Sequence, residues 1–269
     1  YNPGSTFKMV TGYAGLRAGF ITRYTTINDT GVYTKYEDFQ PRCWLYSVAG
    51  GGHGPLDIVN ALRYSCNYFF YTIGDNIGAN SLVSAAESFG FGASTGIEIG
   101  DDAGTVASPE YKEKTLGESW YAADTLLASI GQSHNNFTPV QLANYASTIA
   151  SGGMVNKLTL LNSVKSADYT ETVFTNKAEY LKEFDAEGKS FIAILQEGME
   201  AVSDVGGSSY SIFGNYPVKV ACKTGTVQSD SDSSNNGVFI CYAPADDPEI
   251  AVSIVVEKGT SGAQIMTIA

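Results

Sequence analysis

The stretch Pro3-Gly4-Ser5-Thr6-Phe7-Lys8-Met9-Val10 (PGSTFKMV) decides how the rest of the chain is interpreted. The apolar run that follows it predicts a helix over residues 5–19, so Ser5 falls in the first helical turn. A capping box would place Glu or Gln three residues after Ser5, where a negative charge suits the positive end of the helix dipole. Lys8 stands there instead. Its charge costs helix stability unless its proton leaves easily, so the pair predicts a serine nucleophile with a lysine base.

The composition of the chain limits its fold and its partners. A length of 269 residues, with 43% hydrophobic and 16% charged residues, supports one domain with a sizeable core. The net charge of −12 argues against nucleic acid or an anionic membrane surface as a partner. No stretch of the sequence approaches the roughly 18 apolar residues of a membrane-spanning helix, and no signal peptide is recognisable. We therefore expect a single domain over residues 1–269, with membrane contact only through flanking segments that are absent from this sequence.

The pattern of apolar residues divides the chain into a helical body and a late sheet. Helical spacing dominates roughly residues 1–205, apart from an acidic, polar segment at 162–188 that we expect to lie on the surface. Three β-rich runs follow within roughly 215–260, and a Ser-, Asp- and Asn-rich connection at 229–236 separates the first two. The strands are expected near 217–225, 237–243 and 249–257. The sequence thus predicts an α/β chain of the α+β type, with a helical body and an antiparallel sheet.

The cysteines give little sign of a metal site. They are Cys43, Cys66, Cys222 and Cys241. Their positions show neither a CxxC motif nor a His-paired spacing, which argues against a zinc site and predicts no bound metal. We expect buried free thiols, with one or two disulfides as the alternative. His53 lies in the glycine-rich stretch GGGHGP, where a lone histidine is more often structural than a catalytic base.

Two further motifs accompany the Ser5-x-x-Lys8 pair. Ser65-Cys66-Asn67 lies where a helical run ends or kinks, 60 residues after Ser5. Lys223-Thr224-Gly225-Thr226 lies at the end of the first late strand, 158 residues further on. Each motif alone has an ordinary explanation: a helix-capping serine, polar groups at a helix end, and a solvated lysine at a strand end. Their order and separation argue against chance, and together they match the three-part signature of active-site serine enzymes.

The sequence around these motifs resembles the transpeptidase domain of class B penicillin-binding proteins. The resemblance rests on PGSTFK, ALRYSCNYFFY, FGFGASTGIEI, SIGQSHNNFTPVQLANYASTIASGG and KTGT, and it covers nearly the whole chain outside the acidic segment. It implies a β-lactamase/transpeptidase-like fold and a D,D-transpeptidase that is acylated by β-lactams. The substrates would be peptidoglycan stem peptides with D-Ala-D-Ala ends, and no cofactor is implied. The parent protein would be membrane-anchored, would face the extracytoplasmic side, and would work with other cell-wall synthesis proteins.

The motif residues can be given catalytic roles on this basis. Ser5 would be the nucleophile, because the helix N-terminus stabilises developing negative charge on its oxygen. Lys8 lies one turn on and would be the base, since burial, the helix dipole and the charge of Lys223 all lower its pKa. Ser65 would relay a proton to the departing D-alanine nitrogen.

The remaining motif residues would bind the substrate. Asn67 would hold the peptide bond through its carboxamide. Lys223 would bind the terminal carboxylate, assisted by the hydroxyl groups of Thr224 and Thr226. Gly225 would leave the strand edge clear for the substrate. As the resemblance implies, the backbone N–H groups of the nucleophile and of Thr226 would form the oxyanion hole.

Other serine acylation functions share the first motif. A β-lactamase must activate a deacylating water, and the Glu-x-x-Leu-Asn element of the class A enzymes does not occur between Ser65 and Lys223. A carbamylated base at Lys8 stays open, although the surrounding sequence is unlike that of the class D enzymes. A D,D-carboxypeptidase and a penicillin-binding sensor domain that only signals are further alternatives. Turnover of the acyl-enzyme separates these functions.

The resemblance also implies structure outside this sequence. In the family the central sheet has five strands, two of them from sequence ahead of the serine helix, and a C-terminal helix covers one face. We therefore expect a fragment that is incomplete at both ends, with an unpaired sheet edge and a partly uncovered apolar face. Such a fragment is expected to be poorly soluble and weakly acylated, and native flanking sequence should restore both properties.

Replacement of the proposed nucleophile gives a first test. Ser5→Ala should abolish covalent attachment of penicillin, because no other side chain is expected to form the acyl bond. The fold should survive, since loss of a helix cap costs about 1 kcal/mol. Intact-protein mass spectrometry after penicillin treatment measures the adduct, and an adduct that persists in the variant would disprove the assignment.

Overall fold

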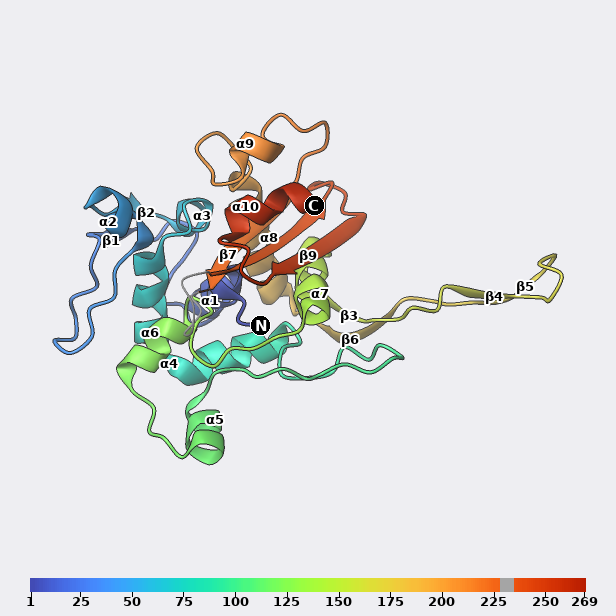
Figure 1. Cartoon of the computed structure of the whole chain (residues 1–269), viewed down its shortest axis with the longest axis horizontal. Coiled ribbons are helices and arrows are strands. Elements are labelled where there is room, and N and C mark those ends of the chain that lie inside the picture. The colour runs from blue at the N-terminus through green and yellow to red at the C-terminus, as the bar shows by residue number, and fades with distance from the viewer. Residues whose placement is uncertain (228–234) are drawn as a thin grey trace.

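A computed structural model of the protein describes residues 1–227 and 235–269 and shows a helical body beside a three-stranded antiparallel sheet (Figure 1). The longer helical segments are η1 (Gly4–Phe7) continued by α1 (Lys8–Arg17), α3 (Ile58–Arg63), α4 (Asn67–Ser88), α6 (Ala122–Ala128), α7 (Pro139–Ala150) and α8 (Ala186–Ala201). Shorter segments are α2 (Trp44–Ala49), α5 (Pro109–Tyr111), η2 (Lys112–Leu116), α9 (Tyr210–Phe213), α10 (Gly262–Ile265) and η3 (Met266–Ile268). The predicted α+β architecture is confirmed. Among the described residues, no helix combines the length and the apolar character needed to cross a lipid bilayer.

The three late strands form the main sheet in the order β7 (Ala221–Val227), β8 (Asn236–Ala243) and β9 (Ile250–Val256). All three predicted strands are present, but the first begins four residues later than expected. Pro217, which cannot donate to a strand ladder, stands in a bend at residues 217–218 ahead of the strand. Most of the predicted connection at 229–236 lies outside the described residues.

The two faces of the main sheet pack against different sets of side chains. Ile240 and Tyr242 of β8 point into the main core, which also contains α1 and α8. Phe239 and Cys241 alternate with them and belong to a second cluster that includes Phe213 of α9. Ile265 and Met266 of the α10–η3 segment also join this second cluster, and α10 lies across that face of the sheet (Figure 1). A short helix therefore covers the face of the sheet that the sequence predicted to be partly exposed.

Helix α1 lies at the centre of the body, and nine of its ten residues are buried. It packs between α4 and α8, so it is enclosed on all sides and needs no polar face. Two glycines allow the close packing. A Cβ atom at Gly12 would lie 3.0 Å from Ile58, and one at Gly15 would lie 2.8 Å from Ile73. Lys8, at the start of this apolar helix, is therefore held inside the protein.

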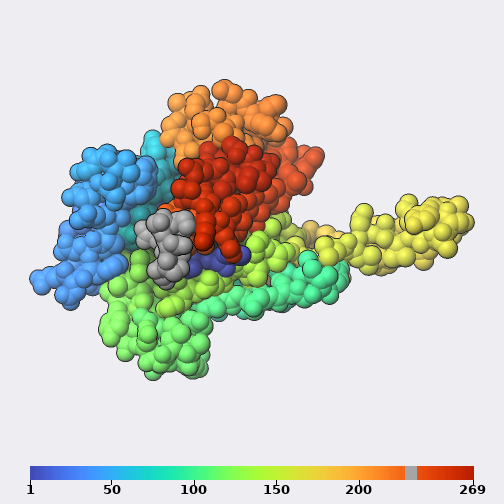
Figure 2. Space-filling view, viewed as in Figure 1, coloured from blue at the N-terminus to red at the C-terminus, as the bar shows by residue number. Residues whose placement is uncertain are grey.

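A two-stranded arm projects far from the body (Figures 1 and 2). At its base β3 (Met154–Lys157) pairs with β6 (Glu179–Glu183), and toward its tip β4 (Ser163–Lys165) pairs with β5 (Thr172–Thr175). Every residue of β5 and β6 is exposed. The surface location predicted for 162–188 is confirmed for most of the segment, but α8 already begins at Ala186.

A small ribbon lies beside the helical body. In it β1 (Ile27–Asp29) pairs antiparallel with β2 (Gly54–Leu56), and the chain between them carries α2. Asp29 is buried at the end of β1 and accepts a 2.7 Å hydrogen bond from the Gly31 backbone N–H. The ribbon therefore brings its buried carboxylate against the start of α4, which forms part of the site described below.

A stacked aromatic pair offers a test of the core. Phe91 and Phe137 are almost fully buried, and their ring centroids lie 3.9 Å apart beside Phe7, the residue before Lys8. Phe91→Ala should lower the free energy of unfolding by about 3–5 kcal/mol, because it removes a large buried side chain and leaves a cavity. Denaturant unfolding measures the change. Val173→Ala in the exposed arm is the control, and a comparable loss there would contradict this account of the core.

Candidate active site

The start of η1 is fixed against strand β7. Gly4 has a φ of +53°, which disfavours any residue with a Cβ atom. A Cβ atom there would also lie 3.0 Å from the Thr226 carbonyl oxygen. The Gly4 backbone N–H donates a 3.0 Å hydrogen bond to the Gly131 carbonyl oxygen. These contacts place Ser5, which is half-buried, beside the end of the Lys-Thr-Gly strand, and its hydroxyl has no hydrogen-bond partner among the described residues.

Ser65 occupies a strained turn between α3 and α4. The Cys66 N–H bonds to the Ala61 carbonyl oxygen at 2.9 Å and the Ser65 N–H bonds to that of Leu62 at 3.1 Å, the two bonds of a Schellman helix end. Ser65 takes the left-handed position of this motif, with a φ of +53°, where glycine is usual. Such a conformation costs on the order of 1 kcal/mol or more for a serine. The predicted break in the helical run is confirmed, and Asn67 begins the next helix.

Lys8 joins the first two motifs. Its fully buried Nζ donates hydrogen bonds to the Ser65 carbonyl oxygen at 2.7 Å and to the Asn67 Oδ1 at 2.6 Å. It also lies 3.2 Å from the Ser65 Oγ. The left-handed turn directs the Ser65 carbonyl away from the helix ladder, which makes it available to the lysine. The structure therefore brings Lys8, Ser65 and Asn67 together as predicted.

Lys223 reaches the same serine from the other side of the site. Its Nζ is fully buried and donates to the Ser65 Oγ at 2.8 Å and to the Thr224 carbonyl oxygen at 3.2 Å. The prediction that the third motif joins the first two in space is consistent with this contact. The Ser65 hydroxyl thus lies between two buried amines.

Burial and mutual repulsion favour neutral amines at this site. Burial lowers the pKa of Lys8 to about 8. Burial, and after it the positive charge of Lys8, hold the pKa of Lys223 well below the usual lysine range. The free site therefore disfavours two simultaneous ammonium groups, and the lowered pKa of Lys8 makes its neutral form available near neutral pH.

Strand β7 presents the rest of the third motif. Thr224 and Thr226 are partly exposed, whereas Gly225 is buried. A Cβ atom at Gly225 would lie 2.7 Å from the Pro3 carbonyl oxygen, so glycine is needed here for packing against the chain before Ser5. The sequence predicted a different reason for glycine at this position, namely room for a substrate at the strand edge. Gln132, which the sequence reasoning did not single out, donates a 3.2 Å hydrogen bond to the Thr226 carbonyl oxygen and supports this strand end.

A comparison with protein families identifies the domain. The family model described as "Penicillin binding protein transpeptidase domain" matches residues 1–267. The chain belongs to the penicillin-binding protein transpeptidase family. This membership confirms the family resemblance and the transpeptidase fold that the sequence motifs implied.

Relatives of known identity agree with this membership. The peptidoglycan D,D-transpeptidase MrdA of Escherichia coli is 27% identical over 290 residues, which cover 100% of this chain and 44% of that protein. The solved structure of the penicillin-binding protein PBP2 from Helicobacter pylori has a TM-score of 0.86 at 27% identity and covers 100% of this chain and 47% of its own; this relative has also been solved in complex with MreC. Penicillin-binding protein A from M. tuberculosis, solved as a ceftriaxone acyl-enzyme, has a TM-score of 0.79 at 28% identity, covering 97% of this chain and 56% of that chain. The chain spans about half the length of the proteins it matches.

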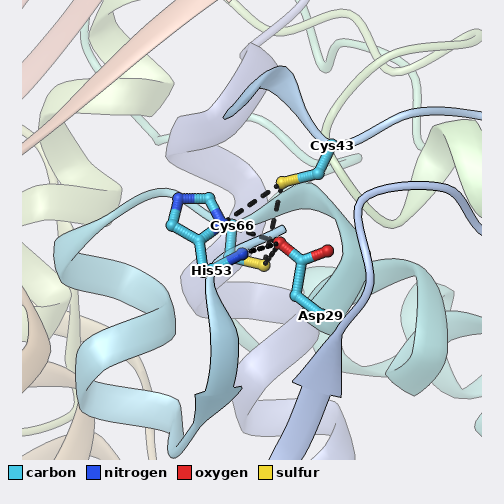
Figure 3. Close-up of side chains that lie close together, drawn as sticks. All are labelled: Asp29, Cys43, His53 and Cys66. Carbon is cyan, nitrogen blue, oxygen red and sulfur yellow. Dashed lines mark hydrogen bonds and ion pairs between the residues drawn. The ribbon is translucent and has the colours of Figure 1, made fainter. Parts of the chain in front are cut away.

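A second cluster of polar side chains adjoins the Ser65 turn of this penicillin-binding domain (Figure 3). Its members are Asp29, Cys43, His53 and Cys66, and their ligand atoms lie within 4.8 Å of one another. The Asp29 Oδ2 accepts hydrogen bonds from the His53 Nδ1 at 2.7 Å and from the Cys66 Sγ at 3.3 Å. The Cys43 Sγ lies 3.5 Å from the His53 Nδ1 and 3.9 Å from the Cys66 Sγ. The hydrogen bond between the Cys43 and Cys66 sulfurs lowers the pKa of Cys43, and burial raises the pKa of Cys66.

This cluster is the one group in the described part of the chain that has the donor atoms for a metal ion. Two thiols, an imidazole nitrogen and a carboxylate oxygen form a set that suits Zn²⁺, and ligand bonds of about 2.0–2.3 Å would fit inside the cluster after small shifts. A bound ion would tie the β1–β2 ribbon to the Ser65 turn. Sequence spacing did not reveal the group, because its members are 10 to 14 residues apart along the chain and follow no regular motif. The expectation that all four cysteines are buried free thiols agrees with the structure.

The pKa of Lys8 predicts how acylation depends on pH. In the predicted role of base for Ser5, Lys8 accepts a proton only when its amine is neutral, so the penicillin acylation rate should rise about tenfold per pH unit below about 8 and level off above it. Stopped-flow or mass-spectrometric acylation rates between pH 6 and 10 measure this profile.

Two variants separate the roles of the lysines. Lys8→Arg should lose orders of magnitude in acylation rate at every pH, since a guanidinium does not deprotonate at usable pH. Lys223→Arg should lose less, because binding of a carboxylate needs a cation and not a base. Equal losses in the two variants would contradict the assignment of Lys8 as the base and Lys223 as the carboxylate-binding cation.

Proposed function

We propose that this chain is the catalytic domain of a peptidoglycan D,D-transpeptidase, which cross-links stem peptides through an acyl-enzyme on Ser5. The observation that carries the proposal is the contact of two buried lysines, Lys8 and Lys223, with one hydroxyl group, that of Ser65. Buried amines without a carboxylate partner are costly, so such an arrangement is retained where it does chemistry. The relatives named as D,D-transpeptidases support the same activity.

Acylation would begin with removal of the Ser5 proton by neutral Lys8. The Ser5 Oγ then attacks the carbonyl carbon of the penultimate D-alanine, and the oxyanion lies against backbone N–H groups of Ser5 and Thr226. The C–N bond breaks, and the leaving nitrogen takes a proton from the Ser65 hydroxyl, which recovers one from Lys8. D-Alanine departs and an ester remains on Ser5. The amine of a second stem peptide then attacks the ester, forms the cross-link and returns the proton to Ser5.

Substrate binding would set the charges of the two lysines. A terminal carboxylate beside Lys223 stabilises its ammonium form and raises its pKa from the depressed value of the free site. A positive Lys223 in turn repels a proton on Lys8. Because the Ser65 Oγ contacts both amines, it offers a path for a proton from Lys8 to Lys223. The base would thus become neutral when an anionic substrate arrives.

The site would accept β-lactams for the same reason. A β-lactam carries a carboxylate and a strained amide in place of the D-Ala-D-Ala end, and the ring nitrogen stays attached after acylation. The ceftriaxone acyl-enzyme of the M. tuberculosis relative supports this reactivity. A D,D-carboxypeptidase, a β-lactamase and a sensor domain would share the acylation step and differ in what happens next.

The location and partners follow from the substrate. Peptidoglycan is assembled outside the cytoplasmic membrane, so we propose that this domain works on the extracytoplasmic side as part of a longer, membrane-anchored protein. The complex of the H. pylori relative with MreC supports a place among cell-wall synthesis proteins.

Turnover after acylation distinguishes the candidate functions. We expect intact mass spectrometry to show one penicillin adduct that persists for hours, because the three motifs contain no carboxylate to activate a deacylating water. A stem-peptide donor with an added acceptor amine should give a cross-linked product. Loss of the adduct within minutes would indicate a β-lactamase. Hydrolysis of the donor peptide without cross-linking would indicate a carboxypeptidase. A stable adduct without any peptide turnover would indicate a sensor domain.

A further inference from the structure

A row of aromatic and cationic side chains lies beside the Ser65 turn. Trp44, the first residue of α2, is 43% exposed, and its indole N–H donates a 2.9 Å hydrogen bond to the Tyr64 carbonyl oxygen. The Trp44 ring meets the His53 ring in a T-shaped contact with 5.5 Å between centroids, and His53 stacks on Tyr64 at 5.8 Å. Arg63 completes the row, with its guanidinium carbon 5.3 Å from the centroid of the Tyr64 ring. These contacts fix the orientation of an exposed indole next to the proposed catalytic turn.

Two of the four arginines in the chain lack a carboxylate partner in its described part, and both belong to this surface. Arg17 and Arg23 each form ion pairs with two carboxylates. Arg42 and Arg63 instead lie over tyrosine rings, Arg42 over that of Tyr46 at 5.4 Å. The Nε of Arg63 is buried and has no hydrogen-bond partner among the described residues. In a chain with 28 acidic and 16 basic residues, two such guanidinium groups indicate a surface for a ligand that supplies anionic or other acceptor oxygens.

This surface lies within reach of a stem peptide bound at the proposed nucleophile. Tyr64 directly precedes Ser65, and consecutive Cα atoms are about 3.8 Å apart. The Ser65 hydroxyl contacts both lysines of the site. About four residues of a stem peptide separate its scissile bond from the sugar that carries it, and an extended chain of that length spans about 14 Å. The glycan strand joined to a bound stem peptide therefore has to lie close to the three motifs, as this surface does.

We propose that the surface formed by Arg42, Trp44, Arg63 and Tyr64, named here the α2 platform, binds the glycan strand of peptidoglycan. The identity of this polymer rests on the proposed function. The C–H face of a sugar ring carries partial positive charge, which suits the negative face of an aromatic ring. The guanidinium N–H groups donate to hydroxyl and acetamido oxygens of the sugars and attract the free carboxylates of the stem peptide. The α2 platform thus holds the polymer while its stem peptide enters the site.

Helix α2 has the open surface that a polymer needs. None of its six residues is buried, and the side chain of Val48 is 78% exposed. In Figure 2 this segment, in blue, lies on the surface of the body. Trp, Tyr and Arg are also enriched in protein interfaces, so a partner protein is the competing occupant. The position favours the glycan, because a protein seated here would cover the approach to the Ser65 turn that the polymer has to reach.

Binding of the sugar polymer without its peptides tests the inference directly. The probe is short, soluble, uncross-linked peptidoglycan glycan from which an amidase has removed the stem peptides. It is titrated into the whole chain by calorimetry, with Zn²⁺ in the buffer because His53 also belongs to the four-residue cluster. We expect saturable binding. In Trp120→Phe, which leaves Trp44 as the remaining tryptophan of the chain, the glycan should change the fluorescence of Trp44.

Two substitutions of Trp44 separate its ring from its hydrogen bond. Trp44→Gln keeps a donor for the Tyr64 carbonyl oxygen and loses the ring, so it should bind the glycan about tenfold more weakly, which corresponds to about 1.4 kcal/mol. Trp44→Phe loses the donor and keeps a ring, so its affinity should fall much less. In both variants the penicillin acylation rate should change less than glycan binding does, because penicillin carries no sugar.

The arginines allow a matched test of charge. Arg42→Ala should weaken the binding of glycan that still carries its stem peptides, and the effect should shrink at high salt. Arg17→Ala removes the same charge outside the α2 platform, at a side chain paired with Asp185 and Glu187, and should leave glycan binding unchanged.

Three results would overturn the inference. The first is wild type that does not bind the peptide-free glycan. The second is Trp44→Gln that binds the glycan as tightly as wild type, which would leave the α2 platform to a partner protein. The third is an equal loss in Trp44→Gln and Trp44→Phe, which would show that the hydrogen bond to the turn matters and the ring does not.

The outcomes also separate this inference from the proposed function. Wild type that is not acylated by penicillin would overturn the proposed function, while binding of the peptide-free glycan still decides whether the surface holds sugars. If Trp44→Gln does not fold, as judged by circular dichroism, the fluorescence of Trp44 and the comparison of Arg42→Ala with Arg17→Ala supply the decision.

Discussion

The hydrogen bonds from the buried Lys8 amine to the Ser65 turn are the contacts on which the site depends. They join the first helix to the start of α4 across 57 to 59 residues of sequence. The lysine loses solvation by being buried in an apolar helix, and the carbonyl and carboxamide oxygens of the turn replace part of it. The turn, in its left-handed conformation, exposes the carbonyl oxygen that makes this possible. These hydrogen bonds therefore offset part of both costs, the backbone strain of the turn and the desolvation of the lysine.

The position of the third motif follows from backbone packing. Gly4 and Gly225 allow the chain around Ser5 and strand β7 to approach to a distance that no side chain would permit. Lys223 then reaches the Ser65 hydroxyl from the strand. Three segments that are far apart in sequence thus meet. Glycine at positions 4 and 225 leaves room for close backbone packing, and Ser65 adopts the left-handed conformation that the turn requires.

Much of this arrangement could be predicted from the sequence. Three features left local signals in the sequence, and the structure has all three. They are the positive charge of Lys8 near a helix N-terminus, the break in the helical run at Ser65, and the late strands. The cluster of Asp29, Cys43, His53 and Cys66 left none, because tertiary packing alone brings a ribbon and two helix caps together. The two-stranded arm was visible only as a polar segment: its strands β4, β5 and β6 bury almost nothing, so no alternation of apolar and polar residues was needed to specify them.

The arm has a consequence for how the domain tolerates change. Its outer strands contribute no buried side chain to either hydrophobic cluster, so their length and composition can drift without cost to the fold. Both ends of the arm enter the body close together, at Met154 and Glu183, which are paired in the β3–β6 ladder. A fluorescent protein or an affinity tag spliced into its tip would be carried clear of the body, from which the arm projects in Figure 2. The arm is thus a natural attachment point on an otherwise tightly packed domain.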